Sequence, residues 1–159
     1  QTAGGTITLV TTGSTASAVK TVNINQTGHA TFTASAGLDG AGGTYDIDQT
    51  ASSAAMTFDV SGASAAVTAN QTAAATLTLT QPGASANINV LQTAAATATL
   101  DLDGASGVYD IDQTNASTIT LDQTGDNANF VISQAGGSGD IVTMTTNGAS
   151  ANVDIIQRD

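Results

Sequence analysis

Apolar and polar residues alternate with period two in short stretches along the whole chain. In residues 76–81, leucines and a closing Gln occupy every second position, and threonines fill the positions between them. In residues 86–92, aliphatic residues and a second closing Gln alternate with asparagines and one leucine. This alternation is typical of β-strands that bury one face. The pattern predicts pairs of short strands, each pair joined by a turn.

The strand pairs recur at a nearly constant interval that glutamines mark. The separations between successive closing glutamines are 23, 22, 21, 21, 21 and 23 residues. A fixed period of this length is the signature of a repeat protein. The sequence therefore predicts one domain, residues 1–159, with repeats at about 5–26, 27–49, 50–71, 72–92, 93–113, 114–134 and 135–157. The closing residues are Gln26, Gln49, Gln71, Gln92, Gln113, Gln134 and Gln157.

A glycine stands nine residues before the closing Gln in six of the seven repeats. Glycine and its neighbours there are turn residues, and we expect the glycine to supply a positive φ. Each repeat is then strand, turn, strand. In the first repeat the turn, from Thr12 to about Thr21, is longer by roughly four residues and contains Lys20. The turn glycines are Gly40, Gly62, Gly83, Gly104, Gly125 and Gly148.

Aligning the repeats places apolar residues in columns, which predicts an all-β fold: a parallel β-solenoid of seven strand-turn-strand coils. A coil of a solenoid buries its apolar face only against its neighbours, so such columns are required. Two residues before the closing Gln stand Ile24, Ile47, Ala69, Val90, Ile111, Ile132 and Ile155. Four before it stand Val22, Tyr45, Val67, Ile88, Tyr109, Phe130 and Val153. The first arms supply Leu9, Ala36, Phe58, Leu79, Leu100, Leu121 and Met144.

The closing glutamines are expected to form a ladder inside this solenoid. Stacked amides can bond to their equivalents in the coils above and below, which offsets the cost of burying them. Gln81 and Gln123, which close the first arms of their repeats, are assigned to the same structural ladder. The glutamines are therefore interpreted as structural residues rather than catalytic ones.

The predicted end coils carry no device that would stop stacking. Monomeric solenoids protect their ends with capping helices, charged edge strands or prolines. Here the last repeat is as regular as the middle ones, and the only proline, Pro82, falls in a turn. We expect the end coils to pair with other copies, head to tail, into a cross-β fibre. Copies of the chain are thus the expected partners.

The charge of the chain excludes one class of partner and disfavours another. All 13 acidic residues are Asp, the only cations are Lys20 and Arg158, and the formal net charge is −11. A nucleic-acid binder needs a basic surface, and anionic membranes also attract basic proteins. No apolar run is long enough for membrane insertion. The chain has no cysteine, so it can form neither a disulfide nor a thiolate metal site. It begins at Gln1 without an apolar leader, and we expect an exported protein whose signal has been removed.

The repeats resemble curlin repeats, which form the subunits of bacterial curli fibres. The curlin pattern is Ser-x5-Gln-x-Gly-x2-Asn-x-Ala-x3-Gln. Ser117, Gln123, Gly125 and Gln134 match it with the same spacing, and Gln81, Gly83 and Gln92 match its central part. This chain departs from the pattern at the Asn position, which holds Ala or Gly in six repeats. The resemblance implies a functional amyloid of the extracellular biofilm matrix or bacterial cell surface, with a nucleator subunit and an outer-membrane secretion channel as partners.

The strongest alternative is an ice-binding face on the outer side of the first arms. The Thr-x-Thr pattern resembles that of antifreeze solenoids, although threonine is also a common exposed strand residue. One column reads Thr8, Ser35, Thr57, Thr78, Thr99, Thr120 and Thr143. The column two residues earlier reads Thr6, Thr33, Ala55, Thr76, Thr97, Thr118 and Ile141.

Metal binding and catalysis have weaker signals. Aspartates gather on the outer faces, where Ca²⁺ could relieve their repulsion, but no spacing matches a known calcium loop. We therefore assign no metal ligand. The single histidine, His29, has no set of partners that would suggest catalysis, so neither enzymatic activity nor a cofactor is expected. The aspartates concerned are Asp46 with Asp48, Asp110 with Asp112, and Asp101 with Asp122.

Overall fold

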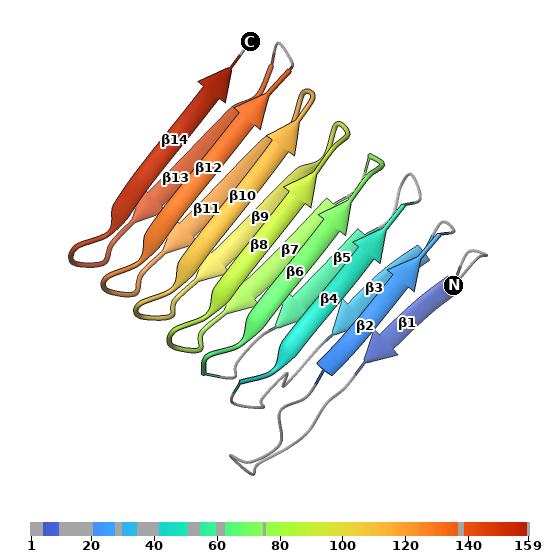
Figure 1. The fold of residues 1–159 in the computed structure, drawn as a ribbon, viewed down its shortest axis with the longest axis horizontal. Helices are drawn as coiled ribbons and strands as arrows, with labels where there is room; N and C mark the ends of the chain where they lie inside the picture. The colour runs from blue at the N-terminus through green and yellow to red at the C-terminus, as the bar shows by residue number, and fades with distance from the viewer. Residues whose placement is uncertain are drawn as a thin grey trace.

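The computed structural model consists of two parallel sheets of seven strands each, and the predicted β-solenoid is confirmed (Figure 1). Along each coil the chain runs through one sheet and returns through the other. The first sheet contains β1 (Gly5–Leu9), β3 (Ala30–Ala34), β5 (Ala55–Asp59), β7 (Thr76–Gln81), β9 (Thr97–Leu102), β11 (Thr118–Gln123) and β13 (Ile141–Thr146). The second contains β2 (Thr21–Gln26), β4 (Thr44–Gln49), β6 (Ala66–Gln71), β8 (Asn87–Gln92), β10 (Val108–Thr114), β12 (Asn129–Ala135) and β14 (Asn152–Arg158).

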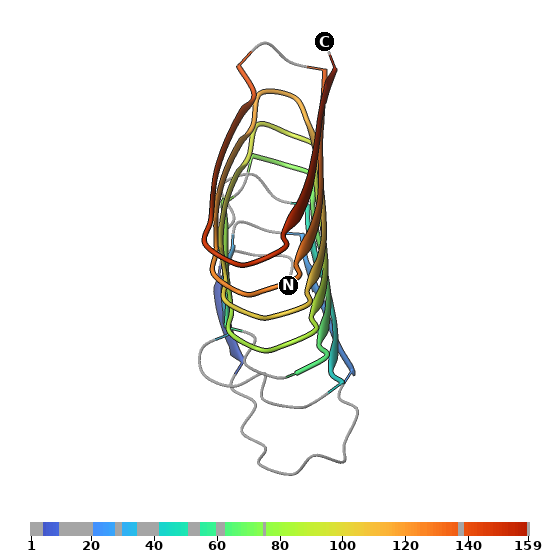
Figure 2. The same cartoon turned by 90° about the vertical axis from the view of Figure 1, so that its left-hand side faces the viewer.

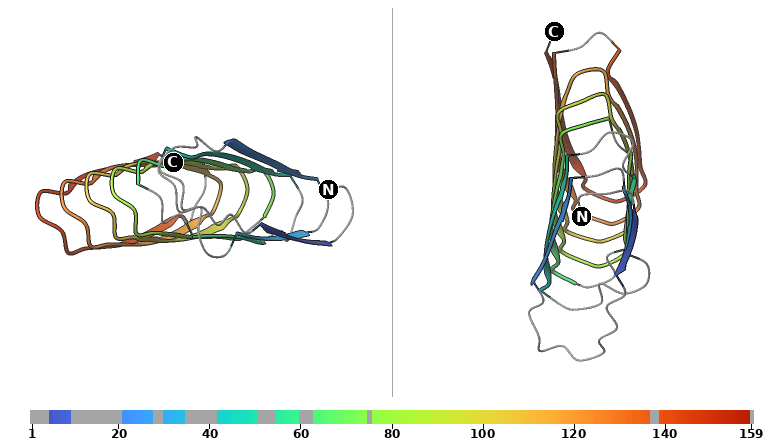
Figure 3. Two further views of the ribbon diagram at one scale, coloured as in Figure 1. Left: turned by 90° about the horizontal axis from the view of Figure 1, so that it is seen from below. Right: turned by 90° about the vertical axis from the view of Figure 1, so that its right-hand side faces the viewer.

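The structure describes residues 5–9, 21–27, 30–34, 42–50, 55–59, 63–74, 76–136 and 139–158. Figures 2 and 3 show the coils as successive loops around one interior, with the first and last coils at opposite ends of the stack. The turn glycines Gly40 and Gly62, together with His29 and Lys20, lie outside the described residues.

The second arms stack in the register that the glutamine alignment predicts. Gln113 in β10 pairs with Gln92 in β8 and Gln134 in β12, and Ile111 lies between Val90 and Ile132. The same register continues from β2 at one end of the sheet to β14 at the other. Because neighbouring strands of a sheet are roughly 4.8 Å apart, each column is a close-packed row of equivalent residues.

The first arm of the second repeat is registered two residues earlier than we expected. Thr33, not Ser35, pairs with Thr57, and Ala34, not Ala36, pairs with Phe58. The prediction was wrong because it counted a constant distance back from Gln49. The two extra residues of this repeat fall between its two arms, so β3 shifts while β4 keeps its register.

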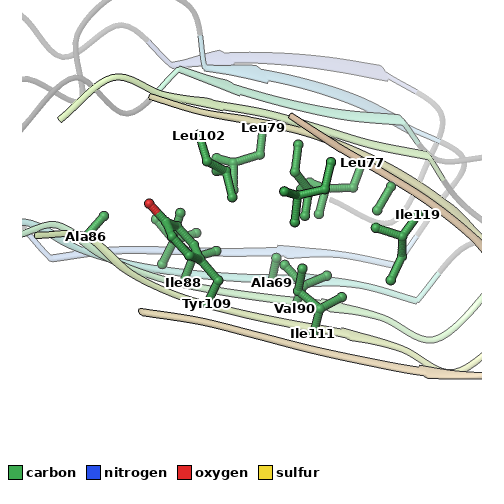
Figure 4. Packing of buried hydrophobic residues seen from close by; sticks show 14 of the residues in the cluster. Ala69, Leu77, Leu79, Ala86, Ile88, Val90, Leu102, Tyr109, Ile111 and Ile119 are labelled. Atoms are coloured by element: carbon green, nitrogen blue, oxygen red, sulfur yellow. The ribbon is translucent and has the colours of Figure 1, made fainter. Parts of the chain in front are cut away.

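The core is a thin apolar layer between the sheets (Figure 4). Leucines and isoleucines of the first sheet meet the Val, Ile and aromatic columns of the second, and the rings of Tyr109 and Phe130 stack with centroids 4.7 Å apart. Each tyrosine follows a glycine by two positions. A Cβ at Gly107 would lie 2.0 Å from the hydroxyl oxygen of Tyr109, and a Cβ at Gly43 would lie 2.4 Å from that of Tyr45. Glycine therefore makes room for the larger ring.

The turn glycines allow close stacking, and for the four that are described, Gly83, Gly104, Gly125 and Gly148, the prediction that they supply positive φ was wrong. The described residues with positive φ include Ser85, Ser106 and Asn127, each two positions after a turn glycine. A Cβ at Gly125 would lie 2.2 Å from the backbone oxygen of Gly104 in the coil below. The glycines at 104 and 148 are equally close to the turns below them. The turn backbones thus approach more closely than any side chain permits.

Candidate functional site

The closing glutamines form a continuous ladder of side-chain hydrogen bonds through the described coils. From Gln71 onward, each amide Nε2 donates to the Oε1 of the glutamine one coil nearer the N-terminus, and the Gln49 Nε2 donates to the backbone oxygen of Ala55 at 3.3 Å. The donor–acceptor distances are 2.8 Å for Gln71 to Gln49, 2.6 Å for Gln92 to Gln71, 2.6 Å for Gln113 to Gln92, 2.8 Å for Gln134 to Gln113 and 2.8 Å for Gln157 to Gln134. For Gln26 the structure describes only the backbone, and the β2–β4 register places this residue beside Gln49. The ladder therefore has the same direction from Gln71 to Gln157.

Gln81 and Gln123 do not belong to this ladder, contrary to the prediction. Leu102 lies between them in the sheet, so their amides are two coils apart and cannot bond to each other. Instead Gln81 accepts a hydrogen bond from the Tyr109 hydroxyl at 2.9 Å, and Gln123 donates to the backbone oxygen of Gly125 in its own turn. The Gln81 Nε2 and the Gln123 Oε1 are buried without a hydrogen-bond partner. Gln81 thus bonds to the next coil in the opposite sheet, and Gln123 bonds within its own turn.

The outermost coil, β13 and β14, exposes the residues that the inner coils bury. Val153 and Ile155 are 39% and 45% exposed, although their neighbours in β12, Phe130 and Ile132, are fully buried. The first arm of this coil is also open, with Met144 half-buried. The difference arises because no described strand covers β13 or β14 on its outer side. A strip of core residues is thus left at one end of the stack.

The opposite end of the stack carries the same kinds of residues. Val22 and Ile24 of β2 are half-buried and pack against the core from one side only. The backbone of β1 places Ile7 and Leu9 in the corresponding columns of the other sheet. Both end coils therefore present aliphatic residues, and no described strand pairs with the outer edge of either coil.

The outer face of the first sheet is a regular array of threonines. The register places one threonine of every coil in a single unbroken column: Thr8, Thr33, Thr57, Thr78, Thr99, Thr120 and Thr143. The corrected register of β3 removes Ser35 from this column. Threonine, alanine and isoleucine share the neighbouring column, so only one column is uniform.

Two aspartates on the outer faces, Asp101 and Asp112, have a raised pKa. Burial and then the nearby charges of Asp103 and Asp122 raise the pKa of Asp101, and Asp122 is its direct neighbour in β11. Burial and the charge of Asp110 raise the pKa of Asp112, and a hydrogen bond from Ser133 partly opposes this. Burial alone raises the pKa of the Tyr109 hydroxyl to about 12, so this group stays neutral and can donate to Gln81.

The aspartates do not form a recognisable metal site. Among the described residues, no group of three or more His, Cys, Asp or Glu side chains is placed to hold an ion.

Within the same part of the chain, no helix is long and apolar enough to cross a membrane.

Sequence reasoning missed a second series of inter-coil bonds, which runs through the turns. In several turns, a residue with positive φ donates its backbone N–H to the next coil: Ser85 to Ala105 at 2.7 Å and Ser106 to Asp126 at 2.7 Å. Ser64, Asn127, Asn115 and Gly136 do the same. A signal was present, because the string Gly-Ala-Ser recurs at 62–64, 83–85, 104–106 and 148–150.

Together, the sheets, the amide ladder and the turn bonds define a parallel β-solenoid whose coils are joined by the same contacts at every level. Comparisons with protein-family models, with curated proteins and with solved structures gave no match to this chain.

Proposed function

We propose that this protein is a structural subunit of an extracellular, curli-like functional amyloid fibre that assembles head to tail through its end coils. The observation that carries the proposal is the outermost coil. Its Val153 and Ile155 are partly exposed, while equivalent residues one coil inward are fully buried. Covering this strip with a further coil would remove apolar surface from water, which stabilises association.

The contacts inside the stack support the same function. Each coil offers its neighbour strand edges, a buried amide and aliphatic residues, and nothing in these contacts depends on the two coils belonging to one chain. Glutamine ladders and parallel, in-register strands are characteristic of amyloid fibres, where every copy repeats them. The fibre is therefore an extension of the fold by the same interactions.

The setting of this function is proposed from the resemblance to curlin repeats. It places the fibre at the surface or in the biofilm matrix of a bacterium, where such fibres serve adhesion. A nucleator subunit and an outer-membrane secretion channel are the proposed partners besides further copies of the chain. The net charge of −11 would keep free subunits in solution before they assemble.

Negative-stain microscopy of the purified chain, with thioflavin T fluorescence on the same sample, tests this function. We expect long unbranched filaments that bind the dye. Ile132→Asp should abolish them, because every copy would then bury a charge in its core. Thr120→Asp, on the exposed face of the neighbouring sheet, is the control and should still assemble. A wild-type chain that stays monomeric for days would contradict the proposal.

A second candidate function is ice binding by the outer face of the first sheet. It is favoured by the unbroken threonine column, in which hydroxyl and methyl groups repeat at the strand spacing of roughly 4.8 Å. Thermal hysteresis of the monomeric chain is the direct measurement. Thr99→Tyr should remove any activity because it interrupts the array at its centre, whereas Asn89→Tyr on the opposite sheet should not. A wild-type chain without hysteresis would exclude this function.

A further inference from the structure

We propose that the coil of β13 and β14 binds the coil of β1 and β2 of a second copy in one polarity and one register only. This inference rests on the proposed self-assembly and specifies its contact. Continuing the register of the second sheet places Gln157 beside Gln26, Ile155 beside Ile24 and Val153 beside Val22 of the next copy. The junction is thus heterologous, joining two different surfaces of the same chain.

The hydrogen bonds give the stack a direction. From Gln71 to Gln157, each rung of the closing ladder donates toward the N-terminal end. Gln157 therefore donates to Gln134, and no described rung lies beyond Gln157 to donate to it. The turn residues with positive φ donate the opposite way, toward the C-terminal end, as Asn127 does to Ala149. The two ends of the stack therefore differ in which donors and acceptors they leave unused. They complement each other only when unlike ends meet.

Contact between like ends lacks this complementarity. A twofold axis relating two copies through β14 would make the paired strands antiparallel. Centred on Ile155, that arrangement places Gln157 of each copy opposite Val153 of the other. The amide would then be covered by an aliphatic side chain without a partner, which costs about 1–3 kcal/mol per buried group.

The charges on the outer face are compatible with this register. Head-to-tail continuation places Asp154 beside Asn23, Arg158 beside Thr27 and Asn152 beside Thr21. None of these pairs brings two carboxylates together, although Asp101 and Asp122 do meet inside the chain. A chain with a net charge of −11 thus joins its copies without adding a like-charge pair in this sheet.

Disulfide cross-linking tests both polarity and register, because the chain has no cysteine of its own. Asp154→Cys and Asn23→Cys in one chain should be neighbours across the junction, roughly 4.8 Å apart at Cα and within disulfide range. We expect oxidation of assembled protein to give a ladder of covalent multimers. The off-register pair Asp154→Cys with Thr21→Cys, roughly 8 Å apart, should give about tenfold less product. The intramolecular pair Val131→Cys with Asp154→Cys is the positive control, since these residues are neighbours inside the chain.

The single variants decide between the polarities. Covalent dimers from Asp154→Cys alone would show contact between two C-terminal coils, and dimers from Asn23→Cys alone would show contact between two N-terminal coils. Either result, or equal cross-linking of the off-register pair, overturns the junction. Filaments without cross-links in the matched pair would leave the fibre function intact and remove this inference. Cross-linked multimers without filaments would support this junction and contradict the fibre function.

Half-blocked subunits give an independent readout in solution. Val153→Asp places a charge on the exposed strip of one end, and Ile24→Asp does so at the other end, while the opposite end of each variant is unchanged. Each variant alone should remain monomeric by light scattering. Mixed one to one, they should form a complex of two copies through their intact ends and grow no further. Circular dichroism of each variant confirms that it is folded, and a mixture of folded variants that stays monomeric contradicts the junction.

Discussion

At the scale of single residues, the closing glutamines are bound from both sides. Gln113 donates to Gln92 and accepts from Gln134, and all three side chains are buried. A buried amide with two such bonds neither needs water nor tolerates the loss of a neighbour, because each broken bond leaves a polar atom without a partner. The ladder is therefore a cooperative element, and its inner rungs contribute more than its end rung.

Replacing Gln113 by Leu should lower the free energy of unfolding by about 2–5 kcal/mol, because the Gln92 Oε1 and the Gln134 Nε2 both lose their partner. Denaturant titration followed by circular dichroism measures the loss. Gln157→Leu removes one bond at the exposed end and serves as the control, with a smaller effect. Equal losses in the two variants would mean that the ladder does not act cooperatively.

The turn residues allow a contrast between adjacent positions. Gly125→Ala should destabilise the chain by about 1–3 kcal/mol, because the new Cβ would lie 2.2 Å from the Gly104 oxygen. Ser106→Gly should be neutral or stabilising by up to about 1 kcal/mol, because it relieves a φ of 60°. Thermal unfolding of both variants makes the comparison. Destabilisation by Ser106→Gly would show that the serine side chain is required in the turn.

At the scale of strands, each β-strand has an inner face that packs in the core and an outer face that carries the polar and charged residues. The inner face repeats with little variation, while the outer face alternates threonine, asparagine and aspartate. Most aspartates of the strands have neutral neighbours in register, such as Asp59 beside Thr80 and Asp48 beside Asn70, which donates to it at 2.8 Å. Asp101 and Asp122 are the exception, and they make the first sheet sensitive to pH.

The stability of the solenoid should increase on acidification. The folded state raises the pKa of Asp101, so it disfavours the charged form of this group. This penalty is absent below the ordinary pKa of about 4 and grows as the pH rises through the raised value. Asp101→Asn should therefore increase stability at pH 7 by a few tenths of a kcal/mol and flatten the pH profile. Asp59→Asn is the matched control, and an equal effect there would exclude the Asp101–Asp122 repulsion as the cause.

At the scale of the whole molecule, stability is nearly one-dimensional. The strands of the structure contact only strands one coil away in the same sheet, or residues across the thin core. In such a protein the free energy of folding is close to a sum over coils and the interfaces between them. The chain is then a short segment of a potentially longer stack, which is the property that the proposed fibre uses.

Removal of one complete coil tests this description. Deleting residues 93–113 joins Gln92 to Thr114, whose position relative to the closing Gln is that of Thr93, so the six remaining coils keep their register. This variant should fold into a shorter and less stable solenoid, with its β-sheet circular dichroism retained. Deleting residues 93–103 removes β9 alone, so β8 and β10 of the second sheet would follow each other without the first-sheet strand between them, and this variant should not fold. Loss of structure in both variants would mean that the coils are not interchangeable.

Much of this architecture could be predicted from sequence, because it depends on local repetition. The alternation in residues 86–92 assigns inner and outer faces, and the spacing of the closing glutamines places the second arms in register. The ladder follows from these two facts. The turns were harder to predict, because Gly125 and Asn127 are both common turn residues. Only the structure shows that Asn127 has the positive φ and that Gly125 must lack a side chain because the coil below lies too close.

The sequence by itself thus determined the coil period, the face of each regular strand and the column of closing glutamines, because these properties repeat within 21 to 23 residues. Tertiary structure decided the register of β3, the hydrogen-bond partners of Gln81 and Gln123 and the exposure of Val153 and Ile155. Each of these depends on what lies in the neighbouring coil: how a longer turn is accommodated, that Leu102 separates the two glutamines, and that no described strand covers β14. Such contacts join residues some twenty positions apart, and the pattern within a single strand does not contain them.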